Sequence, residues 1–230
     1  MLYLLIDLFV IIIPLVFSFH PRIRFDKEWR FFFPANLLTG MLFVSWDIWF
    51  TAQGVWDFNP AYVTGITWLG LPMEEILFFF CIPYACMFTL HAIQNIYPEF
   101  RINWRKMLVL FLILLSACIS VIFTDRIYTL FSFGTFAVIL LITWLVMKEK
   151  TDHFFLMYLI ILLPFFIVNG ILTGSWIEGE VVSYNNAENL GIRMLTIPVE
   201  DAFYGMTLLM LHFLLMEVLK RIRPQRTLPM

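Results

Sequence analysis

Long apolar runs separated by short polar stretches dominate the chain. Residues 107–124, 127–147 and 154–172 contain no Asp, Glu, Lys or Arg. Each run approaches the roughly 20 apolar residues that cross a hydrocarbon core of about 30 Å. The same pattern, with a few polar interruptions, predicts four further helices of similar length. The seven predicted spans cover residues 2–19, 31–53, 71–96, 107–124, 127–147, 154–172 and 195–219.

The composition agrees with this pattern. Hydrophobic residues make up 61% of the chain and charged residues 14%, against roughly 25% charged in a soluble domain. We therefore expect an all-α membrane protein. The first apolar run lacks a basic segment before it and carries Asp7, so it resembles a retained spanning helix more than a cleaved signal peptide.

Basic residues predict how the spans are oriented. Thirteen of the 15 Lys and Arg residues follow the first, third, fifth and seventh spans, and only Arg126 and Arg193 do not. The positive-inside rule then places the amino terminus outside and the carboxyl terminus in the cytoplasm of a multi-pass cell-membrane protein. That orientation requires an odd number of spans, which favours seven independently of hydropathy.

Two acidic motifs occur 126 residues apart, "LPMEE" at 71–75 and "IPVED" at 197–201. The same offset pairs two further residues of the preceding loops, Asn59 with Asn185 and Gly65 with Gly191. We interpret this as an internal repeat within one membrane domain, 1–230. Two parallel three-helix repeats, spans 1–3 and 5–7, are joined by a linker helix. The first repeat covers residues 1–100, the linker helix 101–125 and the second repeat 126–220. Substrate sites often lie at the interface between such repeats.

The paired carboxyls have a purely structural explanation, because acidic residues are ordinary in the first turn of a helix that follows proline. Two facts favour a functional one. Ionisable groups near the membrane centre cost about 2.5–3.5 kcal/mol each, and this pair recurs in the second repeat. We therefore predict that both motifs approach one shared cavity.

Adjacent helix residues point about 100° apart, so one carboxyl of each pair should face that cavity while the other meets a helix, a loop or an arginine. Arg193 is the expected counter-ion, and Asp47 is another acid within a span. In a dry site, burial and like charge favour the protonated acid, whereas a helix amino terminus favours the anion. The arrangement offers one general acid and one general base.

Longer stretches around these motifs resemble a known family. "WDIWFTAQGVWDFNPAYVTG" and "LGLPMEEILFF" are similar to the first half of the integral-membrane lycopene cyclases, and "NGILTGSWIEGEVVSYNNAENLGIRMLTIPVEDAFYG" to their second half. The likeness covers essentially the whole chain. It corresponds to the fused form of this cofactor-independent carotenoid cyclase family, with both halves in one polypeptide.

The resemblance implies a lycopene β-cyclase, an intramolecular lyase or isomerase that forms β-ionone rings without net redox change. It implies an acid/base set made of Glu74, Glu75, Glu200 and Asp201, and it leaves open which is the acid. We expect Glu74→Gln and Glu200→Gln each to lose most cyclisation. The candidate substrate-side residues are Trp46, Asp47, Trp49, Trp56, Phe78, Asn169, Arg193 and Tyr204. The aromatic members could stabilise a cation through their ring faces or simply pack at the membrane interface.

Several functional classes lack their signatures. The sequence has no Gly-rich dinucleotide fingerprint, no P-loop and no D-D-x-x-D diphosphate motif, and its four histidines have no ligand spacing. We therefore expect no cofactor and no metal, and the formal net charge of −2 argues against a nucleic-acid partner. An E-E-x-x-x-R protease would need arginine where Phe79 stands.

Two alternatives stay open, a proton-coupled transporter that uses paired carboxylates and a cyclase for longer-chain carotenoids. The expected partners are a carotenoid, the lipid bilayer and, by association, other enzymes that make carotenoids.

Overall fold

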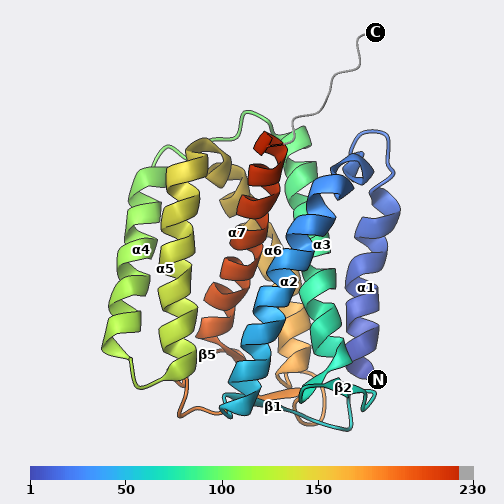
Figure 1. The fold of residues 1–230 in the computed structure, drawn as a ribbon, viewed down its shortest axis with the longest axis vertical. Helices are drawn as coiled ribbons and strands as arrows, with labels where there is room; N and C mark the ends of the chain where they lie inside the picture. The colour runs from blue at the N-terminus through green and yellow to red at the C-terminus, as the bar shows by residue number, and fades with distance from the viewer. Residues whose placement is uncertain (223–230) are drawn as a thin grey trace.

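The structure is a computed structural model that describes residues 1–222, in which seven α-helices stand side by side in one bundle (Figure 1). They are α1 (Leu2–Phe17), α2 (Trp29–Ala52), α3 (Met73–Ile96), α4 (Arg105–Ile122), α5 (Ile127–Met147), α6 (Thr151–Leu172) and α7 (Val199–Ile222). Two short 3₁₀ helices, η1 (Phe25–Glu28) and η2 (Lys148–Lys150), precede α2 and α6. The predicted all-α class is confirmed, and the seven predicted ranges coincide with these helices to within four residues at each end.

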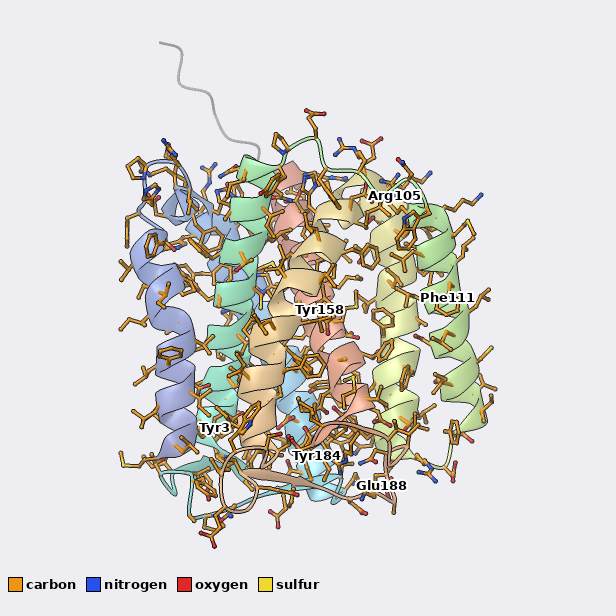
Figure 2. All side chains as sticks on the ribbon, turned by 180° about the vertical axis from the view of Figure 1, so that it is seen from behind. Tyr3, Arg105, Phe111, Tyr158, Tyr184 and Glu188 are labelled. Atoms are coloured by element: carbon orange, nitrogen blue, oxygen red, sulfur yellow. The ribbon has the colours of Figure 1, made fainter. Side chains whose placement is uncertain are left out.

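The helices are consistent with an integral membrane protein. Five helical stretches of the described chain are long and apolar enough to cross a membrane. One of them, Ile127–Leu172, contains both α5 and α6, and α1 is a shorter apolar helix of 16 residues. Apolar side chains cover outward faces of the bundle, as Phe111 does on α4 (Figure 2). Such exposed apolar surface suits lipid rather than water.

Six short strands lie at one end of the bundle, near the amino terminus (Figure 1). They are β1 (Trp56–Phe58), β2 (Thr67–Trp68), β3 (Leu71–Pro72), β4 (Val182–Tyr184), β5 (Arg193–Met194) and β6 (Ile197–Pro198). The hairpin β2–β3 leads directly into α3, and the hairpin β5–β6 leads into α7. Each hairpin ends on a proline, which lacks the N–H that a helix start leaves unpaired.

The antiparallel pair β1–β4 joins loops from the two halves of the chain. Asp57 lies opposite Ser183, its counterpart 126 residues later. On either side, the Asn59 N–H donates to Val181 O and the Asn185 N–H donates to Val55 O, each at 2.9 Å. A shift of 126 residues therefore maps one hydrogen bond onto the other. The two loops occupy matching positions and together close this end of the bundle.

Ion pairs tie the helices together at the opposite end. Arg105, at the start of α4, pairs with the fully buried Asp152 of α6 at 2.6 Å. Lys220 of α7 pairs with Glu28 at 2.7 Å and with Glu217 at 3.0 Å. Most basic residues of the described chain lie at this end, away from the strands.

Candidate active site

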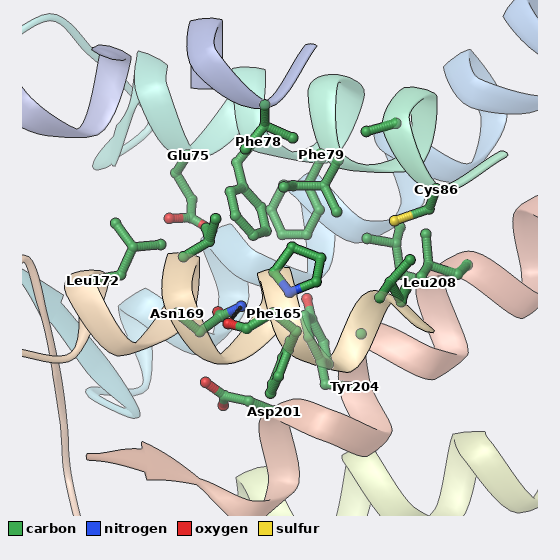
Figure 3. A pocket seen from close by; sticks show the side chains of 18 of the residues that line it. Glu75, Phe78, Phe79, Cys86, Phe165, Asn169, Leu172, Asp201, Tyr204 and Leu208 are labelled. Carbon is green, nitrogen blue, oxygen red and sulfur yellow. Dashed lines mark hydrogen bonds between the residues drawn. The ribbon is translucent and has the colours of Figure 1, made fainter. Parts of the chain in front are cut away.

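A mostly apolar cavity of about 400 Å³ lies inside the bundle and reaches the end closed by β1 and β4. Its walls come mainly from α1, α3, α6 and α7. Figure 3 shows Glu75 reaching in from α3, and Asp201 and Tyr204 from α7. The polar lining consists mainly of carboxyls and phenols, namely Asp47, Glu75, Asp201, Tyr3, Tyr128, Tyr158, Tyr184 and Tyr204.

Glu75 lies in the first turn of α3 and is 8% exposed. The preceding Pro72 has an extended backbone and ends the hairpin β2–β3, so the helix begins at the next residue. The phenol of Tyr3, near the start of α1, donates a hydrogen bond of 2.5 Å to Glu75 Oε2. A buried carboxyl therefore has a directed phenol donor that comes from a different helix.

Asp201 occupies the equivalent position in α7 and is 6% exposed. The phenol of Tyr128, near the start of α5, donates to Asp201 Oδ1 at 2.5 Å. A second phenol, Tyr184 of β4, donates to Asp201 Oδ2 at 2.9 Å. Asp201 thus accepts two phenol hydrogen bonds where Glu75 accepts one, so the two halves of the site are similar but not identical.

Tyr184 lies in the strand region, outside the apolar helices. Burial, together with the neighbouring Asp201 carboxyl, raises the pKa of Tyr184 well above its ordinary value. The phenol, which is protonated at neutral pH even at its ordinary pKa, therefore remains a hydrogen-bond donor at alkaline pH as well.

The other two motif carboxyls turn away from the cavity and hold the loops that precede their helices. Glu74 Oε1 accepts a hydrogen bond of 2.6 Å from the Thr64 N–H. Glu200 Oε1 accepts one of 2.7 Å from the Leu190 N–H and another of 2.7 Å from Thr129 Oγ1. Both residues are almost fully buried. This division of roles follows from the angle of about 100° between adjacent helix residues.

Asp47 adds a third carboxyl to the cavity from α2. It is 2% exposed, and its Oδ2 has no hydrogen-bond partner among residues 1–222. No Lys or Arg side chain of the described residues lines the cavity. Within the same range, no group of three or more His, Cys, Asp or Glu side chains is arranged to hold a metal ion.

Among residues 1–222, the expected counter-ion Arg193 forms no salt bridge with a motif carboxylate. The Arg193 guanidinium instead donates to Thr196 O at 3.1 Å and to Asn186 Oδ1 at 2.6 Å. It also lies over the Tyr184 ring, 5.4 Å from its centroid. These local acceptors hold Arg193 to the loop surface, outside the lining of the cavity.

The predicted substrate-side residues divide into two groups. Asp47, Trp56, Phe78, Asn169 and Tyr204 line the cavity, whereas Trp46, Trp49 and Arg193 do not. Trp46 packs behind the wall against Tyr204, with ring centroids 5.8 Å apart. Trp49 is 38% exposed and packs edge-on against Phe131.

The sequence reasoning missed Tyr3, Tyr128 and Tyr184, which donate to the cavity carboxyls. A signal for two of them was present. Tyr3 and Tyr128 are 125 residues apart, whereas the acidic motifs are 126 residues apart. The two tyrosines therefore do not align when the two halves of the sequence are compared at the motif offset.

A sequence model of the lycopene cyclase family matches residues 1–93 and 125–219. The matched segments contain both acidic motifs and together make up most of the chain. Comparisons with curated proteins and with solved structures found no match. On the strength of the family match, the chain belongs to the lycopene cyclases, a family of carotenoid cyclases.

Proposed function

We propose that this protein cyclises the acyclic ends of lycopene to β-ionone rings by acid/base catalysis in the cell membrane. The observation that carries this proposal is the placement of Glu75 and Asp201, one from each acidic motif, on a single mostly apolar cavity. A hydrocarbon substrate needs apolar walls, and the reaction needs one proton donor and one proton acceptor within reach.

The proposed reaction is balanced in protons and electrons. A carboxylic acid protonates the terminal double bond, and a tertiary carbocation forms. The electron pair of a nearby double bond attacks this cation, which closes a six-membered ring and moves the positive charge onto a ring carbon. A carboxylate then removes a neighbouring ring proton, and the C–H electron pair becomes the ring double bond. One proton is added and one is removed, so no oxidant or reductant is consumed.

Hydrogen bonding supports Asp201 as the base and Glu75 as the acid. Two phenols donate to Asp201, and donors favour the ionised form of a carboxyl. Glu75 has one phenol donor and shares the cavity with Asp47. Repulsion between nearby carboxylates favours a proton on one of them. After each turnover the proton must return from the base to the acid.

Aromatic side chains of the cavity are suited to the cationic intermediate. Trp56, Phe78 and Tyr204 line the same space as Glu75 and Asp201. A desolvated cation over an aromatic face gains about 2 kcal/mol or more. Glu74 and Glu200 have a positioning role in this scheme, because they fix the loops that carry the helix starts.

We further propose seven membrane crossings, with the strand end outside and the end rich in basic residues in the cytoplasm. Residues 1–100 and 126–220 are parallel repeats joined by the linker 101–125. The matching hydrogen bonds at Asn59 and Asn185 support this division. The carotenoid and the lipid bilayer are the proposed partners, with other enzymes that make carotenoids as further associates.

Expression in cells that accumulate lycopene tests the function. We expect new pigments with β-rings, identified by chromatography and absorption spectra. A folded, membrane-inserted protein that leaves lycopene unchanged would contradict the proposal and favour proton-coupled transport. Impermeant labelling of a cysteine introduced at Gly65 tests the orientation, and we expect labelling from outside the cell.

A further inference from the structure

The cavity reaches the apolar outer surface of the bundle on one side, between α1 and α6. Phe9 and Ile13 of α1 line it although they are 72% and 55% exposed. Ile167 of α6 lines it and is 48% exposed. The inner wall is closed, because Phe79 and Leu208 are 1% and 2% exposed. A cavity whose lining is exposed only along one pair of helices has its mouth there.

The arrangement of the helices agrees with a mouth at this place. α1 packs chiefly against α3, and α6 also contacts α3. In Figure 2 the ribbon of α3 is visible between α1 and α6. At the strand end, by contrast, Trp56 of β1 pairs with Tyr184 of β4, and both residues line the cavity. The route to the water phase on that side is therefore covered by backbone and aromatic rings.

A proline lies at the rim on each side of the mouth. Pro14 of α1 and Pro164 of α6 both lie inside their helices and both line the cavity. Proline removes a backbone hydrogen bond to the residue four positions earlier and kinks a helix. The two helices that flank the mouth can therefore bend at the level of the cavity.

The cavity is long and narrow, and its carboxyls lie at one end. Its lining follows α3 from Glu75 to Thr89, which corresponds to about 21 Å at 1.5 Å per residue. Its volume of about 400 Å³ is near the lower end of the roughly 300–1,000 Å³ that holds a drug-sized ligand. This space suits one end of a long polyene. The rest of such a molecule must lie outside it.

We propose that the cleft between α1 and α6 is a lateral portal through which one end of a carotenoid slides in from the bilayer, while the rest of the polyene stays in the portal and the lipid. This inference rests on the proposed function and adds the access route and the residues that gate it, Phe9, Ile13 and Ile167. A hydrocarbon is far more stable in lipid than in water, so access from the bilayer avoids passage through water. One occupied cavity then cyclises one end of the substrate at a time.

Bulky substitutions at the rim test the portal. The purified protein, in vesicles containing lycopene, is compared with Ile13→Trp and Ile167→Trp. The matched controls are Leu8→Trp and Leu159→Trp, which lie on the same helices, are exposed and do not line the cavity. We expect kcat/KM to fall about tenfold or more in the rim variants, with kcat at saturating lycopene much less affected. The controls should stay near the wild type.

Ile13→Ala and Ile167→Ala provide a second measurement that does not require a larger side chain to fit. We expect both to raise kcat/KM, because they widen the portal. If the wild type is active and the variants at Ile13 and Ile167 have the same kcat/KM as the controls, the proposed portal is wrong. A wild type that neither binds nor converts lycopene would instead overturn the proposed function, so the two failures are distinguishable.

Discussion

Glu75 and Asp201 face one cavity from the first turns of α3 and α7, and each accepts a phenol hydrogen bond of 2.5 Å. The donors, Tyr3 and Tyr128, lie near the starts of α1 and α5. In each half, a carboxyl on one helix is therefore positioned by a tyrosine from another. Four helices converge on these two carboxyls, and the cavity is lined by residues from both halves of the chain.

Glu75→Gln and Asp201→Asn should each abolish most cyclisation, because each removes one of the two proposed proton-transfer groups. We expect kcat to fall about 10²- to 10⁴-fold, the usual contribution of general acid/base catalysis. Turnover is measured by chromatography of pigments from vesicles, together with the melting temperature. Glu149→Gln, exposed at the far end of the bundle, is the control. Wild-type turnover in either folded site variant would remove that carboxyl from the chemistry.

Glu74 and Glu200 should respond differently. Each accepts a partly buried hydrogen bond from a backbone N–H in the loop before its helix, so Glu74→Ala and Glu200→Ala leave that N–H without its partner. We expect each to lose about 0.5–1.5 kcal/mol of unfolding free energy, the usual net contribution of a hydrogen bond, with a fall in turnover that follows the misplaced loop. Glu75→Gln, by contrast, should lower turnover while the melting temperature stays close to that of the wild type. Unchanged melting temperatures in both alanine variants would contradict the positioning role.

Tyr3→Phe and Tyr128→Phe test the phenol donors. Tyr128 donates to the proposed carboxylate base, and hydrogen bonds to charged groups contribute about 1.5–3 kcal/mol, so we expect kcat to fall roughly 10- to 100-fold in Tyr128→Phe. Tyr3 donates to the proposed protonated acid, and a neutral hydrogen bond contributes about 0.5–1.5 kcal/mol, so we expect a fall of roughly 2- to 10-fold in Tyr3→Phe. KM should change little, because the ring and its packing remain. Tyr97→Phe is the matched control, since Tyr97 is exposed at the opposite end of the bundle. A rise in KM with normal kcat would indicate that the phenols bind substrate instead of orienting carboxyls.

The helices could be predicted because their signal is local and long. Every predicted span coincides with an observed helix, since some 20 apolar residues leave little choice of structure in lipid. The acidic motifs were also visible, because each follows proline at a helix start. The orientation of the carboxyls could not be predicted, because adjacent side chains on a helix point in different directions. Only the tertiary structure decides which of the two faces the cavity. From the sequence we predicted that Glu74→Gln and Glu200→Gln would lose most cyclisation. In the structure, however, Glu75 and Asp201 are the motif carboxyls that line the cavity.

Contacts between distant segments were the part that could not be predicted. Arg193 looked like a counter-ion because it lies close in sequence to Glu200, yet local loop acceptors hold its guanidinium. Tyr184 reaches Asp201 only because β4 pairs with β1 across the end of the bundle. Neither partner choice has a periodic pattern in the sequence, so neither could be read from hydropathy or spacing.

The turn between β2 and β3 offers a stabilising substitution. Leu69 and Gly70 both have positive φ, 52° and 86°, as the central residues of a type I′ hairpin do. A left-handed backbone costs a leucine about 1–2 kcal/mol, and Leu69 is 68% exposed. Asn-Gly is favoured in such turns, so Leu69→Asn should raise the melting temperature. Ile66 is exposed in the same loop but does not have a positive φ, so Ile66→Asn should leave the melting temperature unchanged. An equal rise in both variants would show that relief of the left-handed backbone is not the cause.

Arg105 and Asp152 form the ion pair whose loss should be most damaging to stability. Asp152 is fully buried, and its Oδ2 accepts a hydrogen bond of 2.6 Å from Arg105 Nη1. Arg105→Ala would leave this carboxyl buried without its cation, at a cost of about 1–3 kcal/mol or more. The exposed pair Arg24–Asp26 is the control, since Arg24→Ala should give no measurable change. Thermal unfolding in detergent measures both variants. Asp152→Asn in the Arg105→Ala background should recover part of the loss, because the amide carries no charge to leave unpaired; no recovery would show that Arg105 acts through packing alone.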